Sequence, residues 1–268
     1  MKNWMLISIY LLFVSLNTSA LENNNDLNVG IKTETKANIL SMQTIEAVLN
    51  DDKRTKPDYL KDEHRKPTEI LTFFNVTPET VVLDVLAGSG YYSEILSGVV
   101  GSKGKVIIHN DKHFLKYYGK SLSERLGNGE RLANTKRIDI SLNNLELEEN
   151  SIDTILLILG YHDFYYVMDG AEKIAVEKVL SNFRRFLKPN GIIGIIDHEA
   201  VKGAPSNVGN TLHRIDPQIV KSEMSDAGFV FDGELDILKN TSDDKSKKIW
   251  DIPNSNTSRF VLRFKNLK

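Results

Sequence analysis

The sequence contains no cysteine among its 268 residues. A chain without thiols forms no disulfide and offers no thiolate to a metal ion, so an oxidising compartment would leave it chemically unchanged. It also lacks a run of lysine and arginine interleaved with aromatic residues, and its formal charge is -2. Because nucleic-acid binding normally leaves a basic patch, we expect no nucleic-acid partner. The near-neutral balance favours a small-molecule substrate or a protein ligand.

The apolar block at the N-terminus, Trp4 to Leu16, is too short to span a bilayer comfortably, with roughly 13 residues where about 20 are needed. Lys2 precedes this block, and Thr18-Ser19-Ala20 follows it as a small-residue cleavage pattern. This order is typical of a secretory signal peptide over residues 1–20. We expect cleavage after Ala20, a periplasmic or secreted protein, and no stable membrane insertion afterwards. A retained N-terminal anchor is the alternative.

The apolar fraction of 41% and the charged fraction of 26% are typical of a packed globular protein. Residues 21–36 are polar and rich in asparagine, which predicts a poorly ordered leader. Residues 37–80 should form an N-terminal helical segment, because apolar residues recur there at helical spacing and Pro67 suits the first turn of a helix. The mixed charges of residues 51–66 predict a solvated face, with closure over a ligand as the alternative. Residues 81–268 are expected to form the main domain.

The stretch from Val81 to Leu96 carries the clearest pattern in the chain. A β-branched run containing Asp84 predicts a buried strand, and the apolar residues at the end of the stretch predict a helix. Between them, Gly88 and Gly90 let the backbone turn tightly and approach a ligand with no Cβ in the way. The free N–H groups at the start of the helix would point at that ligand.

Further strands alternate with helices along the rest of the chain. Strands are expected at residues 105–109, 137–140, 154–159, 192–196, 229–238 and 259–264. Alternation implies parallel βαβ units, and no helix separates the last two strands, so these should pair as a hairpin. The expected fold is α/β: a Rossmann-like, doubly wound, mostly parallel seven-stranded sheet with a C-terminal antiparallel hairpin. The polar insert within that hairpin, residues 239–258, is expected to be mobile.

These landmarks, together with the Leu187-Lys188-Pro189-Asn190-Gly191 turn, resemble the class I S-adenosylmethionine-dependent methyltransferase superfamily. The likeness extends from about His64 to the C-terminus. Several segments are more narrowly similar to a group of predicted exported bacterial methyltransferases: Arg65–Glu69, Leu71–Phe74, Gly160–Phe164, Asp197-His198 and Thr211–Asp216. The chain departs from many superfamily members at three positions. Leu86 replaces a glycine, Asn110 replaces an acid, and Ser141 stands near the place of another acid.

The resemblance implies S-adenosylmethionine as cofactor and a small molecule as methyl acceptor. The superfamily pattern implies that Asn110 or Asp111 binds the ribose, and that Asp139 substitutes for an acid near Ser141. Asp84 would accept hydrogen bonds from the glycine loop or from the cofactor ammonium, with loop stabilisation as the alternative. The implied cofactor-binding residues are Asp84, Ala87, Gly88, Gly90, Asn110, Asp111, Asp139 and Ser141. No pattern identifies the acceptor or the oligomeric state.

Methyl transfer needs a positioned nucleophile and removal of its proton. We predict His162 as the general base, because an imidazole titrates near neutrality, with Asp163 or Asp197 orienting it. The ring of Tyr161 is predicted to face the sulfonium. The predicted catalytic residues, all at strand ends, are Tyr161, His162, Asp163, Asp197 and His198.

Two other interpretations use the same residues. Imidazoles and carboxylates suit a divalent ion, which would make the protein a metal-dependent hydrolase. Its ligands would come from His162, Asp163, Asp197, His198 and His213. No short ligand-spacing motif lies on one element, so no metal is assigned. The other interpretation is an exported binding protein that retains the methyltransferase fold without turnover.

Overall fold

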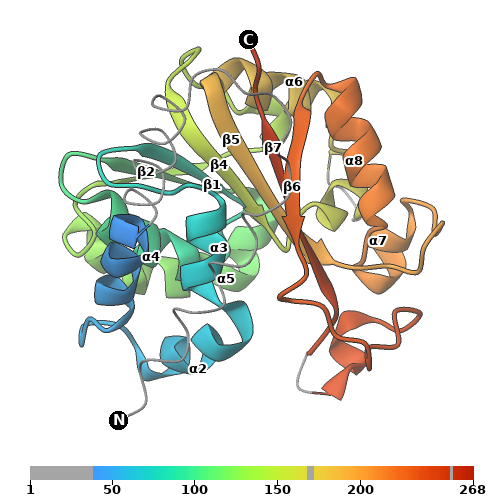
Figure 1. The fold of residues 1–268 in the computed structure, drawn as a ribbon, viewed down its shortest axis with the longest axis horizontal. Helices are drawn as coiled ribbons and strands as arrows, with labels where there is room; N and C mark the ends of the chain where they lie inside the picture. The colour runs from blue at the N-terminus through green and yellow to red at the C-terminus, as the bar shows by residue number, and fades with distance from the viewer. Residues whose placement is uncertain (1–38, 168–171, 254–255) are drawn as a thin grey trace, which may run out of the picture. The chain divides into compact units, whose positions relative to one another are not determined.

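The structure, a computed structural model, describes residues 39–167, 172–253 and 256–268 (Figure 1). The predicted signal peptide (1–20) and leader (21–36) lie outside the described residues. Within the described ranges, no helix combines the length and the apolar character needed to cross a membrane.

A seven-stranded sheet forms the centre of the molecule, as predicted, in the order β3-β2-β1-β4-β5-β7-β6. The strands are β1 (Val81–Val85), β2 (Lys105–Asn110), β3 (Thr135–Asp139), β4 (Ile152–Ile158), β5 (Leu187–His198), β6 (Val230–Leu235) and β7 (Arg259–Lys265). Strands β1 to β5 pair in parallel, whereas β7 is antiparallel to both of its neighbours. The α/β fold class and the C-terminal hairpin are therefore confirmed.

Helices cover both faces of this sheet (Figure 1). Besides a helix over residues 39–49, they are α2 (Lys56–Arg65), α3 (Pro67–Phe73), α4 (Tyr91–Val100), α5 (Lys112–Leu126), α6 (Val176–Phe186), α7 (Val208–Leu212) and α8 (Pro217–Asp226). In the described part of the chain, 3-10 turns accompany them at η2 (Gly127–Gly129), η3 (Leu142–Asn144), η4 (His162–Tyr165) and η5 (Ile249–Asp251).

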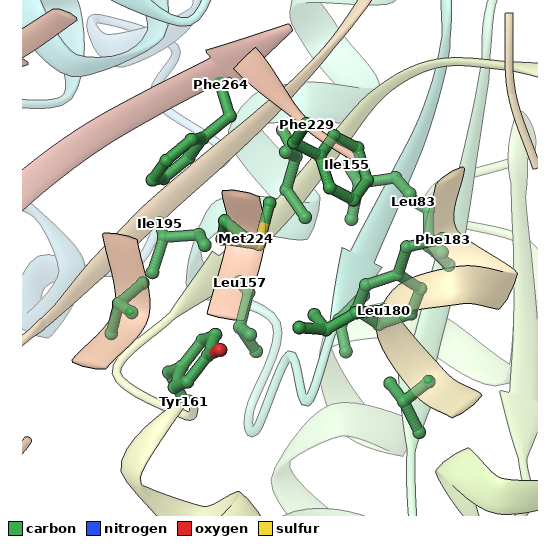
Figure 2. Close-up of a cluster of buried hydrophobic side chains, with 14 of the residues drawn as sticks. Leu83, Ile155, Leu157, Tyr161, Leu180, Phe183, Ile195, Met224, Phe229 and Phe264 are labelled. Carbon is green, nitrogen blue, oxygen red and sulfur yellow. The ribbon is translucent and has the colours of Figure 1, made fainter. Parts of the chain in front are cut away.

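Each face of the sheet has its own hydrophobic core. On one face, Phe183 of α6 and Met224 of α8 pack on sheet residues such as Leu157 (Figure 2). On the other face, Ile95 of α4 and Ile70 of α3 pack against the opposite side of the same strands. Strands buried on both faces read as continuous apolar runs, which is why β1 and β4 could be predicted from the sequence.

Strand β5 begins five residues earlier than predicted. Leu187 pairs with Ile152 of β4, so the predicted turn at Lys188 to Gly191 is part of the strand. The backbone N–H of Asn190 donates to the Asn266 carbonyl at 2.8 Å, and the N–H of Asn266 donates to the Gly191 carbonyl at 2.9 Å. Asn190 has a positive φ of 62°, so the strand backbone departs from an extended conformation at this residue while its pairing with Asn266 is kept.

The prediction of a solvated face over residues 51–66 holds for most of the segment, but not for Arg54 and Asp58, which are buried. Helix α2 occupies much of this segment, and the Asp58 side chain on it is only 2% exposed. Asp58 forms ion pairs with Lys61, at 2.9 Å, and with Arg125 of α5, at 2.7 Å. Burial by itself raises the pKa of Asp58, but hydrogen bonds from Arg125 and Lys61 outweigh it and hold that pKa below its usual range. The mixed charges therefore attach α2 to α5.

The insert between β6 and β7, predicted to be mobile, is anchored in its described part. Arg214 is fully buried, and its guanidinium forms two 2.8 Å hydrogen bonds with the Asp243 carboxylate. It also donates to the carbonyls of Lys247, at 2.7 Å, and Glu199, at 2.9 Å. This bidentate ion pair holds the insert against the segment that follows α7.

Removing the carboxylate of this ion pair should destabilise the fold. We expect Asp243→Asn to lower the free energy of unfolding by about 3–5 kcal/mol, because it leaves the Arg214 charge buried without a counterion. Urea denaturation measures the change. The control is Asp244→Asn, at an exposed neighbouring carboxylate, which should leave the midpoint unchanged. Equal midpoints for the two variants would contradict the anchoring role.

Candidate active site

The carboxyl ends of the central strands bring the predicted site residues to one edge of the sheet. Strand β4 lies between β1 and β5, with Val85 opposite Leu157 and Ile158 opposite Ile196. Just beyond β4, the backbone N–H of Leu159 donates to the Ile196 carbonyl at 2.7 Å. The loops after these three strands are therefore neighbours, as expected for an open α/β sheet.

The glycine loop after β1 is held by the side chain of Asn110. The Asn110 carbonyl oxygen Oδ1 accepts the Gly88 N–H at 2.9 Å, and its Nδ2 donates to the Gly88 carbonyl at 3.1 Å. Gly88 and Gly90 adopt left-handed φ angles of 58° and 80°, which favour glycine. Ala87 donates its N–H to the His109 carbonyl, and its own carbonyl accepts the Gly90 N–H. Three predicted cofactor-binding residues, Ala87, Gly88 and Gly90, thus lie in one tight turn directly before α4.

Leu86 adopts the conformation that the missing superfamily glycine would favour. Its φ is 52°, which costs a non-glycine residue about 1–2 kcal/mol. The side chain is only 3% exposed and belongs to the same core cluster as Leu157. A Cβ at Gly160 would lie 3.2 Å from the Leu86 side chain, so this leucine packs against the loop after β4. The substitution therefore links the two loops and does not project into solvent.

Asp84 lies beneath the glycine loop, on β1. Its carboxylate is 2% exposed and accepts the Ser93 hydroxyl at 2.5 Å, which ties β1 to the first turn of α4. Burial raises the pKa of Asp84 to about 7, against the lowering effects of the Ser93 hydrogen bond and the Arg65 charge. The described hydrogen bond joins Asp84 to α4, and stabilisation of the glycine loop itself stays a prediction. A contact with a cofactor ammonium stays a prediction.

The two ribose candidates at the end of β2 have different surroundings. Asn110 has no exposed surface, and its amide is occupied by Gly88. Asp111 is partly exposed, and its Oδ1 caps α5 by accepting the N–H groups of His113 and Phe114, both at 2.9 Å. The Asp111 charge also contributes to raising the pKa of Asp163, so it lies within electrostatic reach of the loop after β4.

The predicted contacts after β3 have local partners. The Asp139 carboxylate forms a 2.7 Å ion pair with Arg137. The Ser141 hydroxyl accepts the N–H of Asn143 at 3.3 Å and caps η3. Binding of an adenine ring by Asp139 or Ser141 stays a prediction.

Asp197, at the end of β5, is the centre of a buried hydrogen-bonded cluster of predicted catalytic residues. This fully buried carboxylate contacts Nδ1 of His162 at 2.7 Å and accepts the backbone N–H of His162 at 2.8 Å. It also accepts the backbone N–H of His198 at 2.7 Å. With Nδ1–H directed at Asp197, the His162 ring presents Nε2 to the opposite side. The prediction that Asp197 orients His162 agrees with this geometry.

The charge balance does not suit His162 as a free general base at neutral pH. Burial alone lowers the pKa of His162, but the nearby Asp197 and Asp163 carboxylates outweigh it and raise the pKa to about 9. An imidazole that keeps its proton at neutral pH has no lone pair to accept another. The cluster therefore favours a positive charge at this position.

His213, at the end of α7, completes the cluster from a distant segment. Its Nδ1 lies 3.2 Å from Nε2 of His162 and 3.8 Å from Oδ1 of Asp163, and Asp163 Oδ1 lies 3.4 Å from His162 Nε2. Sequence reasoning placed His213 only among the ligands of the hydrolase alternative. The sequence drew attention to His213 only through the Thr211–Asp216 segment, and nothing in that segment indicates that His213 faces His162.

Aromatic rings outside the predicted catalytic residues flank His213. The ring centroids of Tyr166 and Trp250 lie 4.8 and 4.9 Å from that of His213, in tilted and edge-on arrangements. His113 of α5 follows Tyr166, with centroids 6.0 Å apart. These rings come from separate elements, so no local pattern in the sequence connects them.

Two predicted catalytic residues are buried. Tyr161 lies in the hydrophobic cluster around Leu157 (Figure 2). It is fully buried, its ring packs 4.9 Å from Phe164, and its hydroxyl donates to Glu223 at 2.6 Å. Tyr161 therefore belongs to the hydrophobic core, and contact of its ring with a sulfonium stays a prediction. His198 is 8% exposed, its Nδ1 contacts the Thr257 hydroxyl at 2.6 Å, and burial lowers its pKa to about 3.

A cleft of about 850 Å³ lies beside the cluster, on the α6 and α8 side of the sheet. Tyr165, Ile174 and Glu223 line it, whereas the glycine loop and His162 do not. Because it holds none of the clustered imidazoles, we place the candidate site at the strand ends and not in this cleft.

The fold is similar to that of solved methyltransferases. A SAM-dependent methyltransferase from Aquifex aeolicus is 21% identical, with a TM-score of 0.54 over 84% of this chain and 98% of that chain. A geranyl diphosphate C-methyltransferase from Streptomyces coelicolor, solved with Mg2+, geranyl diphosphate and S-adenosyl-L-homocysteine, is 10% identical, with a TM-score of 0.55 over 87% and 98%. Phosphoethanolamine N-methyltransferase 2 of Haemonchus contortus, in complex with S-adenosyl-L-methionine, is 14% identical, with a TM-score of 0.54 over 76% and 53%. No family model and no curated protein sequence matches the chain.

The buried Asp84 should make stability depend on pH. Its pKa of about 7 in the folded protein exceeds the unfolded value of about 3.9, so its contribution is fully present below pH 4 and is lost as the pH rises through 7. Asp84→Asn removes this titration. Between pH 4 and pH 8 the variant should gain up to about 4 kcal/mol relative to the wild type in denaturant unfolding. A difference that stays constant with pH would refute the raised pKa.

Proposed function

We propose that this chain binds S-adenosylmethionine and transfers its methyl group to a small-molecule acceptor. The proposal rests on the position of two features at the carboxyl ends of the strands in a methyltransferase-like fold. The glycine loop, held by Asn110, lies beside the His162 cluster, which consists of His162, Asp163, Asp197 and His213. Bound S-adenosylmethionine would supply an electrophilic methyl group on a sulfonium.

The residues of the glycine loop suit such a cofactor. A Cβ at Gly88 would lie in ordinary van der Waals contact with the Tyr118 ring, at 3.6 Å, so this ring borders the loop on that side. The α4 helix begins directly after Gly90 and offers its free N–H groups. Of the two ribose candidates, we assign the contact to Asp111, because its Oδ2 has no hydrogen-bond partner among the described residues, whereas the Asn110 amide is occupied.

The acceptor side of the site is assigned to Asp163, His162 and His213. The side chains of Asp163 and His213 are 16% and 19% exposed, whereas His162 is 4% exposed and fixed by Asp197. An acceptor would therefore touch Asp163 and His213 first. The overall charge of -2, with no basic run in the chain, supports a small molecule over a nucleic acid.

Calorimetric titration of the purified protein with S-adenosylhomocysteine tests the cofactor proposal. We expect binding with a Kd below about 1 mM. Gly88→Ala should weaken it at least about tenfold, because the added methyl group contacts the Tyr118 ring and strains the left-handed turn of the loop. The control is Gly203→Ala, in the turn after β5, which also has a positive φ, of 82°, and no atom within 4 Å of the added Cβ. It should bind like the wild type.

Failure of the wild-type protein to bind either S-adenosylmethionine or S-adenosylhomocysteine would sink the proposal. Binding without consumption of S-adenosylmethionine across amine, hydroxyl and thiol acceptors would favour the exported binding protein.

We further propose that the chain is exported, on the grounds of Lys2, the apolar block that follows and the small residues up to Ala20. Expressed in a bacterium with a periplasm, the protein should be recovered from the periplasmic fraction. N-terminal sequencing should begin at Leu21. Recovery from the cytosol with Met1 intact would contradict export.

A further inference from the structure

Three side chains at the carboxyl ends of the strands each place one potential ligand atom close to the other two. Nε2 of His162, Oδ1 of Asp163 and Nδ1 of His213 all lie within 4.8 Å of one another. The closest pair, the two imidazole nitrogens, is 3.2 Å apart. A hydrogen bond between the two imidazoles would by itself explain this distance. The nearby carboxylate oxygen of Asp163 adds a third potential metal ligand, which a hydrogen bond between the two rings does not require.

We propose that His162, Asp163 and His213 bind a divalent transition-metal ion, with zinc as the reference ion and one coordination position left open. The inference goes beyond the methyl-transfer proposal, because the site is defined by ligand geometry alone. Of the five potential metal ligands that the sequence suggests, the proposed site retains these three.

The distances match the edges of a coordination tetrahedron. Ligand atoms bound about 2.0 Å from a tetrahedral zinc lie about 3.3 Å from one another. The three distances between the ligand atoms here are 3.2, 3.4 and 3.8 Å. Two imidazoles and one carboxylate also form the ligand set of catalytic zinc sites, in which the fourth position takes water or substrate.

Asp197 supplies the outer support that a metal-bound histidine requires. Its carboxylate lies 2.7 Å from Nδ1 of His162 and holds the Nδ1–H. A metal ion would therefore displace the other proton, on Nε2, and coordinate that nitrogen. The hydrogen bonds from the backbones of His162 and His198 hold Asp197 itself in place. In the same way, Tyr166 and Trp250 restrict the ring of His213.

The local charge calls for a cation. Asp163 and Asp197 are two carboxylates in one buried cluster, and no lysine or arginine in the described part of the chain forms an ion pair with either. The Asp163 carboxylate accepts no hydrogen bond among the described residues, and its Oδ1 lies 3.4 and 3.8 Å from the two imidazole nitrogens. A protonated His162 balances one of the two carboxylate charges, whereas a divalent ion bound to neutral imidazoles would balance both.

The open position suggests the class of acceptor, and this step alone rests on the proposed function. A hydroxyl or thiol that coordinates the ion has a lowered pKa, so its proton passes to solvent water and the heteroatom is held as an anion. An amine lacks this advantage. The site therefore favours hydroxyl or thiol acceptors over amines.

Metal titration of the untagged protein, stripped with a chelator, tests the inference. Co2+ should bind in a 1:1 ratio with the intense visible absorption of tetrahedral coordination, and Zn2+ should displace it. Asp163→Asn and His213→Gln change partly exposed side chains and should each lower the Zn2+ affinity at least 100-fold. Asp197→Asn should lower it by about 10–100-fold, in the range for a ligand's outer partner.

The matched control is His113→Gln, at an imidazole that lies near Tyr166 but outside the three ligands. It should bind Zn2+ like the wild type. Wild-type protein that binds no Zn2+ or Co2+ at 100 µM would overturn the inference, as would equal affinity in Asp163→Asn, His213→Gln and the wild type.

S-adenosylhomocysteine titration of the same proteins separates this inference from the proposed function. Asp163→Asn should lose the metal and retain S-adenosylhomocysteine binding. Wild-type protein that binds S-adenosylhomocysteine but no metal would overturn only the metal site. Wild-type protein that binds the metal but no S-adenosylhomocysteine would support the metal site and overturn only the cofactor proposal.

Discussion

The candidate site depends on a single buried carboxylate. Asp197 has no exposed surface, and it satisfies its lone pairs with two backbone N–H groups and the Nδ1 of His162. Hydrogen bonds to a charged group contribute roughly 1.5–3 kcal/mol each, and a buried carboxylate without them would be strongly destabilising. These bonds join the end of β5 to the chain leaving β4. They fix the turn η4, and with it the positions of His162 and Asp163.

The parallel sheet explains why this cluster faces a second, chemically different loop. Because β4 lies between β1 and β5, their carboxyl ends emerge together, and Leu86 of the glycine loop packs directly on Gly160 after β4. The glycine loop contributes backbone groups and little charge, whereas the cluster contributes imidazoles and carboxylates. Under the proposed function, the first side would hold the cofactor and the second would activate the acceptor. The fold thus places two incomplete binding surfaces side by side.

Local patterns predicted the sheet well, because buried strands read as apolar runs and the C-terminal strands lack an intervening helix. Contacts between residues far apart in the sequence were not predictable in this way. Asp58 looked solvated because its partner Arg125 lies 67 residues away. Tyr161 resembled a site residue because it precedes His162, yet its hydroxyl turns to Glu223. His213 joined the cluster through a contact across 51 residues that no local pattern predicts.

The central claim is that the glycine loop and the His162 cluster form two halves of one methyl-transfer site. A crystal structure of the protein grown with S-adenosylhomocysteine tests it most directly. The ligand should lie over Gly88, with its ribose at Asp111 and its sulfur directed toward the cluster of His162, Asp163 and His213. A ligand bound elsewhere, for example in the cleft lined by Tyr165 and Glu223, would contradict the account.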